Sequence, residues 1–184
     1  MGGACPEMPP SGLPALDEAE QWSWERFLDA AMRLYLLLNR KLLNAHKLTL
    51  FDVLLLEKLA GSGSARVGDL AQALMLTPSR VSQQIRRLES QGLVQRSASN
   101  SDRRGVVATI THDGLVRLRP ALATYGRAVR THYLGQLSRP QLAALGDCAR
   151  RINSEAKPLE THHHSTKKCR ARSAVNRRQH DCPP

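Results

Sequence analysis

The chain has 184 residues and a mass of 20.4 kDa, which is the length of one domain or of one domain with an appendage. It carries 27 Lys and Arg against 16 Asp and Glu, and the formal net charge of +11 points to a polyanionic partner, either nucleic acid or an anionic membrane surface. No apolar run reaches the roughly 18 residues that a membrane span needs, and the first residues lack the features of a secretory signal. We therefore expect no membrane association by a spanning helix, and a cytoplasmic location.

The composition favours packed helices over a β-sandwich. Hydrophobic residues make up 41% of the chain but aromatic residues only 4%, so the core must consist mainly of Leu, Ala and Val. This predicts a mainly α fold with at most a small sheet. The four cysteines contain no short CxxC pair, which argues against a zinc ribbon and against a disulfide framework.

The N-terminal region combines a Pro- and Gly-rich lead, residues 1–14, with a long amphipathic segment. From about residue 15 to 45 apolar side chains recur at helical spacing, and their stripe is wider than one helix face needs. We therefore predict a helix that packs against a second chain as well as its own; the alternative is ordinary core packing within one domain. The apolar positions are Trp22, Phe27, Leu28, Met32, Tyr35, Leu36, Leu38, Leu42 and Leu43.

Three shorter helices are predicted next. Thr49 can cap a helix over residues 50–60 that ends at Gly61, with a Gly-Ser-Gly-Ser loop after it, and a short helix follows over about 68–75. Thr77-Pro78 is a strong helix start, because Thr supplies a cap oxygen and Pro at the first helical position loses no hydrogen bond. This helix runs to about residue 91 and stops at Gly92. Its Val81, Ile85 and Leu88 fall on one side and predict a core face, while the other side is polar and cationic.

The remaining segments predict a hairpin, two helices and a tail. Residues 93–97 and 106–110 have β-type patterns, and residues 100–105 between them have turn composition, which predicts a two-stranded wing with arginines at its tip. Thr111 can cap a fifth helix, and a sixth opens near residues 138–140; both carry apolar seams. From residue 158 the apolar pattern disappears and a basic, disordered tail is expected. Residues 1–48 hold 5 basic and 6 acidic side chains, so the basic excess lies after them.

The order of these elements and three stretches of sequence resemble the MarR family of winged helix-turn-helix transcription regulators. The resemblance covers about residues 48–114 and rests on Leu48–Phe51, on Leu88–Arg96, and on Asp102–Gly105 followed by Val107, Thr109, Ile110, Thr111 and Gly114. The last stretch, an Asp-x-Arg turn before alternating strand residues and Thr-x-x-Gly, is the specific one. The resemblance implies a homodimer that binds pseudo-palindromic DNA, with Arg104 in the minor groove and Asp102 holding an arginine of the wing.

One departure from the family concerns the helix that begins at Pro78. The family commonly has an arginine at the position of Gln83 and a small residue at that of Arg80, whereas this chain has the two types exchanged. The family's base contacts are therefore not carried over to these two positions.

The residues themselves also favour DNA binding. A polar, cationic helix face fits a major groove about 12 Å wide, where Arg can pair with guanine and Gln with adenine. A hairpin tipped with Arg103 and Arg104 suits the narrow, electronegative minor groove. The predicted DNA-binding residues are Thr77, Ser79, Arg80, Ser82, Gln83, Arg86, Arg87, Asp102, Arg103 and Arg104.

The resemblance also implies regulation by a ligand. Relatives commonly bind small, often anionic aromatic molecules between the dimer helices and the winged lobe, and such a ligand acts only by preferring one arrangement of the two recognition helices. The candidate lining residues here are Met32, Tyr35, His46 and Tyr125. Each of them also fits ordinary core packing.

Together these observations predict a mainly α fold with a two- to three-stranded wing, and a dimeric transcriptional regulator, most simply a repressor released by a small molecule. The expected parts are a lead over 1–14, a dimerisation helix over 15–47, a winged helix domain over 48–111, dimerisation helices over 112–157 and a basic tail over 158–184.

Two alternatives belong to other classes of protein. The first is a winged-helix scaffold that binds an acidic protein without recognising DNA sequence. The second is an enzyme, which we do not expect, because the chain has no nucleophile motif, no phosphate-binding Gly loop and no paired carboxylates in a plausible cleft. No cofactor and no metal are expected either. The His162–His164 run with Cys169, His180 and Cys182 lacks apolar neighbours that could hold metal ligands in place, and Cys5 has no basic neighbour to activate it.

Overall fold

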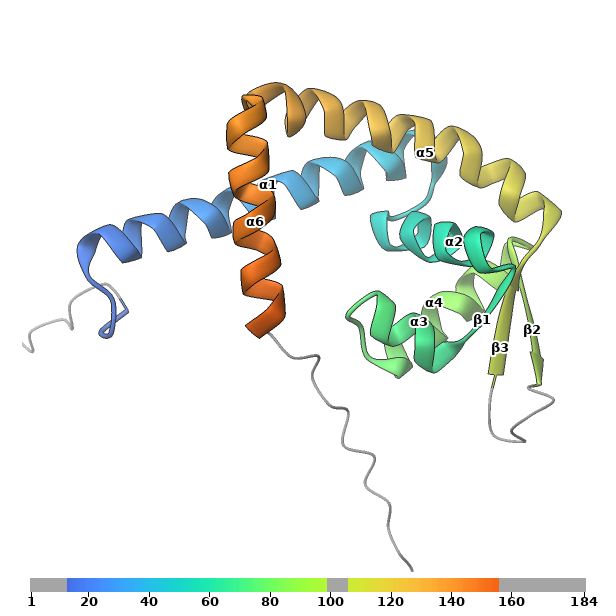
Figure 1. The fold of residues 1–184 in the computed structure, drawn as a ribbon. Helices are drawn as coiled ribbons and strands as arrows, with labels where there is room; N and C mark the ends of the chain where they lie inside the picture. The colour runs from blue at the N-terminus through green and yellow to red at the C-terminus, as the bar shows by residue number, and fades with distance from the viewer. Residues whose placement is uncertain (1–12, 99–105, 156–184) are drawn as a thin grey trace, which may run out of the picture.

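The computed structural model describes residues 13–98 and 106–155 (Figure 1). It consists of a winged lobe, built from short helices and a small sheet, and of three longer helices that extend from it. The predicted lead up to residue 12, the wing tip and the tail from residue 156 lie outside the described residues. Within the described ranges, no helix is both long and apolar enough to cross a lipid bilayer.

Helix α1, Glu18–His46, begins with a capping box in which Asp17 and Glu20 each accept a hydrogen bond from the other's backbone N–H. It ends at Lys47, whose φ of 55° is left-handed. Of its many apolar side chains only Leu38 and Leu42 are buried. The N-terminal half of α1 therefore projects away from the lobe with its apolar residues exposed (Figure 1).

Helix α2, Leu50–Ser62, runs through the centre of the lobe. The predicted cap at Thr49 is confirmed, and Asp52 completes a capping box with it. The predicted end at Gly61 is wrong. The helix continues to Ser62, and the residue that terminates it is Gly63, whose positive φ of 74° suits glycine.

The Gly-Ser-Gly-Ser segment, residues 61–64, is also not simply a loop, because its first two residues belong to α2 and Ser64 begins strand β1, Ser64–Arg66. This strand pairs antiparallel with β3, Val106–Ile110, which in turn pairs with β2, Val94–Ala98. The sheet order is β1-β3-β2, so β1 covers an edge of β3 that would otherwise expose unpaired backbone groups. The wing is thus three-stranded at its base.

Helices α3, Val67–Ala73, and α4, Pro78–Ser90, pack against each other and against the sheet. Their apolar side chains join those of α2, β2 and β3 in one core. Its members with 0% exposure are Leu48, Val53, Leu55, Leu56, Leu59, Val81, Ile85, Leu88, Ala108 and Ala121. This core holds α4 in place from one side and leaves its other side in solvent.

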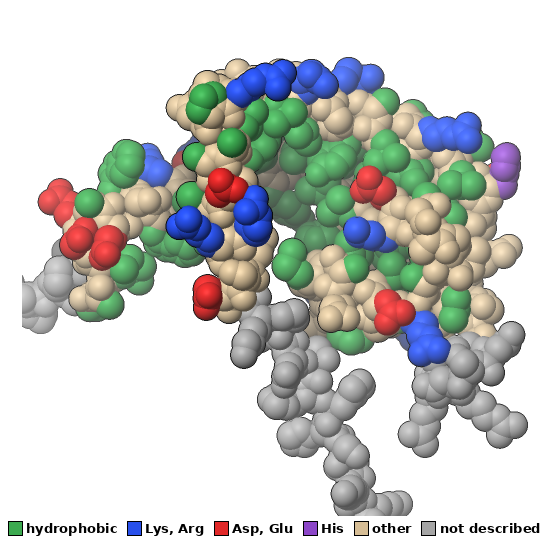
Figure 2. Space-filling model, in the orientation of Figure 1, with side chains coloured by type: hydrophobic (Ala, Val, Ile, Leu, Met, Phe, Trp, Pro, Cys, Tyr) green, Lys and Arg blue, Asp and Glu red, His purple; other side chains and the backbone are tan. Residues whose placement is uncertain are grey.

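Helix α5, His112–His132, begins at the predicted cap Thr111 and leads back from the wing along α1. A 3₁₀ turn, Leu134–Gln136, connects it to α6, Arg139–Glu155. None of the residues of α6 is buried. In Figure 2, Lys and Arg side chains follow the outer edge of α5, and hydrophobic side chains gather beneath it, towards α1 and the lobe.

Candidate nucleic-acid interface

The start of α4 is fixed by its first residues. Thr77 lies in extended backbone with φ of −72° and ψ of 147°, and its Oγ1 accepts a hydrogen bond from the N–H of Arg80 at 3.4 Å. Pro78 occupies the first turn, where the missing N–H costs nothing. Thr77 Oγ1 also lies 3.1 Å from Ser79 Oγ. Thr77, one of the predicted DNA-binding residues, therefore has a structural function as the helix cap.

Helix α4 presents two different faces. Its apolar face is fully buried in the lobe, as the sequence predicts. On the opposite side, five of the predicted DNA-binding residues are exposed and Ser82 is partly buried; the exposed ones are Ser79, Arg80, Gln83, Arg86 and Arg87. The first turn of α4 contains no acidic residue. The exposed face is therefore polar and cationic, and the buried apolar face of the same helix holds it in position on the lobe.

Arg87, another predicted DNA-binding residue, is paired with an acidic side chain of the lobe. Its guanidinium donates to Asp52 Oδ1 in the first turn of α2. The same oxygen accepts a hydrogen bond from Gln84 Nε2 at 2.9 Å. Asp52 is fully buried, whereas the Arg87 side chain is 43% exposed. Two side chains of α4 thus bind one buried carboxylate. The sequence does not predict this contact, because Arg87 lies 35 residues from Asp52.

A second ion pair joins α4 to the sheet. Arg96 Nε on β2 donates to Glu89 Oε2 at 2.6 Å. Both side chains are about one-third exposed. The pair links the end of α4 to the strand that leads into the wing, and sequence reasoning missed it because no local spacing relates the two residues.

The wing tip, with Asp102, Arg103 and Arg104, lies outside the described residues, so these three remain sequence predictions. The base of the wing is anchored to the segment after α4 through Thr111, the residue that follows β3. Thr111 Oγ1 donates to the carbonyl oxygen of Gly92 at 2.7 Å and accepts from the N–H of Gly114 at 3.0 Å. In the register of the hairpin, Arg96 lies opposite Ala108.

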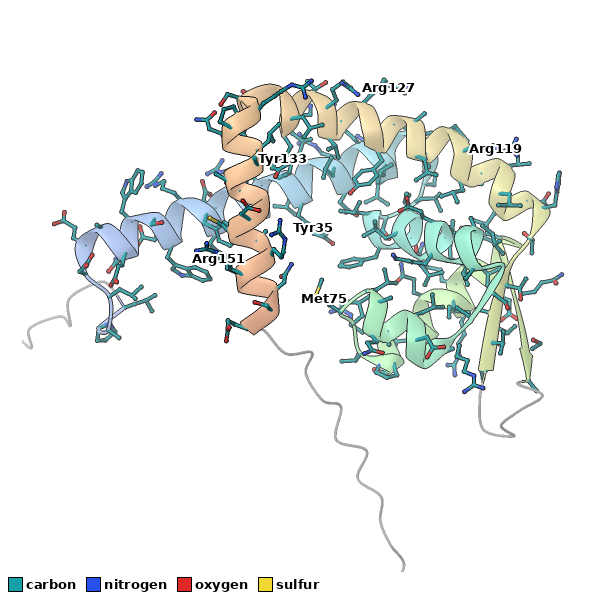
Figure 3. The ribbon with its side chains drawn as sticks, viewed as in Figure 1. Tyr35, Met75, Arg119, Arg127, Tyr133 and Arg151 are labelled. Carbon is teal, nitrogen blue, oxygen red and sulfur yellow. The ribbon has the colours of Figure 1, made fainter. Side chains whose placement is uncertain are left out.

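The four candidate ligand residues occupy different environments. Tyr35 packs near Phe51, with ring centroids 5.9 Å apart, and points from α1 towards the lobe (Figure 3). Met32 is exposed. His46 Nε2 lies 2.8 Å from Thr124 Oγ1, which joins α1 to α5. Tyr125 packs against the hydrophobic core. The structure therefore does not gather these four side chains around one point.

A cavity of about 420 Å³ lies beside Tyr35, between α1, α2 and α4. It does not include Met32, His46 or Tyr125. Its wall combines two aromatic rings with polar and cationic side chains, namely Tyr35, Asn39, Thr49, Phe51, Leu76, Arg80, Gln83, Gln84 and Arg87. Asn39 was not singled out from the sequence, and Phe51 was named only in the stretch that carries the family resemblance, since neither residue belongs to a chemical motif.

A larger cavity, of about 720 Å³, separates the N-terminal part of α1 from α6. Its wall is mostly apolar and includes Trp24, Phe27, Leu145, Ala149 and Ile152. Several of these side chains are themselves exposed. Within residues 13–98 and 106–155, no three His, Cys, Asp or Glu side chains are placed to hold a metal ion. The His- and Cys-containing tail lies outside those ranges.

The arrangement of α2, α3 and α4 with a β2–β3 hairpin defines a winged helix-turn-helix protein, in which α4 is the recognition helix. A family model described as MarR family matches residues 48–106. Two solved structures from Streptomyces coelicolor are 32% identical to the chain. AbsC, a MarR family transcriptional regulator, has a TM-score of 0.73, and the match covers 78% of this chain and 97% of AbsC. Sco3205, a MarR family transcriptional regulator solved in complex with DNA, has a TM-score of 0.75, with 79% and 96% covered. The chain therefore belongs to the MarR family.

A curated relative is the HTH-type transcriptional repressor MdtR of Bacillus subtilis (strain 168), which is 29% identical over 92 residues. That match covers 50% of this chain and 58% of the repressor, so it spans little more than half of the relative's length.

Proposed function

We propose that this chain is a homodimeric transcriptional regulator, acting as a repressor, that binds a pseudo-palindromic DNA operator. The observation that carries the proposal is the recognition helix α4, whose buried apolar face fixes a solvent-exposed face of Ser79, Arg80, Gln83 and Arg86. The relatives support it, since Sco3205 was solved with DNA and MdtR is named a repressor.

The exposed face of α4 can both grip and read DNA. The N-terminal residues of a recognition helix reach base edges in the major groove, and Arg80 and Gln83 lie in the first two turns of α4. Arg can donate two hydrogen bonds to guanine, and Gln can pair with adenine. Ser79 and Arg86 are suited to phosphate oxygens. With the wing arginines Arg103 and Arg104 in the adjacent minor groove, each lobe would contact both grooves.

Dimerisation accounts for the apolar side chains that the single chain leaves in solvent. Trp22, Phe27 and Met32 of α1 are 63%, 50% and 57% exposed, and Ile152 of α6 is 56% exposed. A second copy that covers these helices would remove this surface from water. A two-fold dimer would place two recognition helices in successive major grooves about 34 Å apart.

In this proposal the chain divides as its sequence suggests. The winged domain, 48–111, binds DNA; the helices within 15–47 and 112–157 form the dimer; the lead and the basic tail flank them. A protein that binds an operator acts where the DNA is, and we therefore infer a cytoplasmic location. No catalytic step is assigned, because the matched relatives are described as transcriptional regulators.

The cavity beside Tyr35 supports control by a small anionic aromatic ligand. An aromatic ring could pack against the side of the Tyr35–Phe51 pair, and Arg80 could pair with its carboxylate. Arg80 and Gln83 also belong to the DNA-facing surface, so a ligand bound there would compete with operator DNA. Benzoate is a suitable probe and neutral benzamide its control: release of bound DNA by benzoate alone would support this site.

The proposal is tested by fluorescence anisotropy with DNA from upstream of the protein's own gene and a scrambled duplex of equal length, at several salt concentrations. A preference of about a thousandfold that persists near physiological salt would establish specific recognition. Equal binding to both duplexes with a steep salt dependence would show that charge alone acts. In that case tight retention of one acidic protein would favour the scaffold alternative.

The wing is tested separately with Arg104→Ala. Loss of a minor-groove arginine should weaken operator binding by about 1 to 3 kcal/mol and leave the dimer intact. Undiminished binding by this variant would overturn the assignment of Arg104.

A further inference from the structure

The first turn of α2 contains a polar cluster that links three helices. Asn39 Oδ1 on α1 accepts the N–H of Leu50 at 2.9 Å, and Asp52 Oδ2 accepts the N–H of Thr49 at 2.7 Å. The other oxygen of Asp52 receives Gln84 and Arg87 from the recognition helix. Asp52 is the buried charged residue at the centre of this cluster.

The surroundings of Asp52 stabilise its charged carboxylate in this position. It lies at the N-terminus of α2, where unpaired N–H groups and the helix dipole favour negative charge. It accepts hydrogen bonds from one backbone group and two side chains, which compensates for its removal from water. A buried carboxylate attracts a guanidinium more strongly than a solvated phosphate does, because the interior screens the charges less than water.

Arg87 is also badly placed for reading bases. It lies in the last turn of α4, about 10 Å further along the helix axis than Arg80 at 1.5 Å per residue. Arg86, one position earlier, is exposed and forms no ion pair with any side chain in the described part of the chain. The two adjacent arginines therefore differ in their partners, although their side chains are chemically the same.

We infer that Asp52 is a positioning residue for DNA recognition. It holds Gln84 and Arg87 on the α2 side of the recognition helix and thereby withholds Arg87 from DNA phosphate. The inference rests on the proposed function. The consequence of this arrangement is selectivity for DNA sequence. A free Arg87 would contact the phosphate backbone of every DNA sequence equally. With Arg87 bound to Asp52, discrimination depends on the side chains in the first turns of α4.

The test uses the full-length protein and a duplex selected by the wild type from a random-sequence pool, with a scrambled duplex as reference. The measured quantities are the two dissociation constants and the slope of log K against log salt, which changes by about 0.9 for each phosphate contact. Asp52→Asn keeps the shape of the side chain but removes the charge that holds Arg87. We expect its salt slope to steepen by about one contact and its preference for the selected duplex to fall by about tenfold.

The double variant Asp52→Asn/Arg87→Gln removes both charges together, so it leaves no unpaired ion in the core. We expect its slope and preference to equal those of the wild type, because Arg87 makes no phosphate contact in the wild type. Arg86→Gln is the matched control and should lower the slope by about one contact. Mere damage to packing would not be reversed by the second substitution, so this return to wild-type values is specific to a positioning function.

Two results would overturn the inference. One is a double variant whose slope falls as much as that of Arg86→Gln, which would show that Arg87 contacts phosphate in the wild type; this comparison holds even if Asp52→Asn alone fails to fold. The other is a folded Asp52→Asn variant, checked by circular dichroism, with wild-type slope and preference. Failure of the wild type to enrich any sequence from the pool would instead count against the proposed function.

Discussion

Gly114, in the first turn of α5, lies so close to Leu93 that a Cβ atom at Gly114 would be 2.2 Å from the carbonyl oxygen of Leu93. It would also be 2.7 Å from Cγ1 of Ile110. This contact places the beginning of α5 directly on the segment that connects α4 to β2. The recognition helix, the wing and the long helix α5 therefore meet at a point where no side chain fits.

We expect Gly114→Ala to destabilise the protein by about 1 to 3 kcal/mol, since an added methyl group must displace backbone in a packed site. Gly126→Ala is the matched control in the same helix. A Cβ atom at Gly126 has no neighbour within 4 Å, and Ala favours a helix interior over Gly by about 0.5 to 1 kcal/mol. Chemical denaturation of both variants gives the comparison, and equal stabilities would contradict the close approach at Gly114.

Thr111 joins the same region through its hydroxyl, which caps α5 and donates to Gly92. Thr111→Val keeps the branched shape and removes both hydrogen bonds. We expect a loss of about 1 to 3 kcal/mol in the free energy of unfolding, measured by urea denaturation. Thr111→Ser retains the hydroxyl and should stay within about 1 kcal/mol of the wild type; a Ser variant as unstable as the Val variant would show that the methyl group, rather than the hydroxyl, matters.

The parts of this fold that the sequence predicts are those determined by residues close together in the chain. The caps at Thr49, Thr77 and Thr111 are confirmed because each depends on residues within three positions of it. Strand β1 was missed, since Gly-Ser composition predicts a loop and the pairing that makes it a strand comes from β3, more than 40 residues away. Separation in sequence also explains which parts of the candidate site can be predicted. The polar face of α4 follows from helical periodicity, whereas the partner of Arg87 depends on how α2 packs against α4.

The DNA-facing surface of α4 is distinguished from other basic surfaces by its position. Arg119 of α5 points away from the lobe on the outer edge of the molecule (Figure 3). We expect Arg80→Ala to weaken binding to a selected duplex by about 1 to 3 kcal/mol, and Arg119→Ala, with the same loss of charge, to change it by less than about 0.5 kcal/mol. Equal losses in anisotropy titrations would mean that net charge, and not the face of α4, determines affinity.

The exposed apolar residues of α1 give a direct test of the dimer. Phe27→Glu introduces a carboxylate among the side chains that a second copy would cover. We expect the dimer dissociation constant to rise by about a hundredfold, because an unpaired buried charge costs several kcal/mol, as measured by sedimentation. Met75→Glu is the control: Met75 is 86% exposed on the lobe, and its variant should sediment as the wild type does. Dimers of unchanged stability with Glu at position 27 would exclude this part of α1 from the interface.

Helix α6 has no buried residue of its own. The shape of the whole protein would therefore depend on its concentration in the cell. The winged lobe has a core in every single chain, so dilution leaves it folded. Helix α6 and the N-terminal half of α1 would find a core only in a partner, so below the dissociation constant they lose the packing that orders them. The concentration of the chain would then set the fraction of molecules that are dimers, in which two recognition helices lie at a fixed distance.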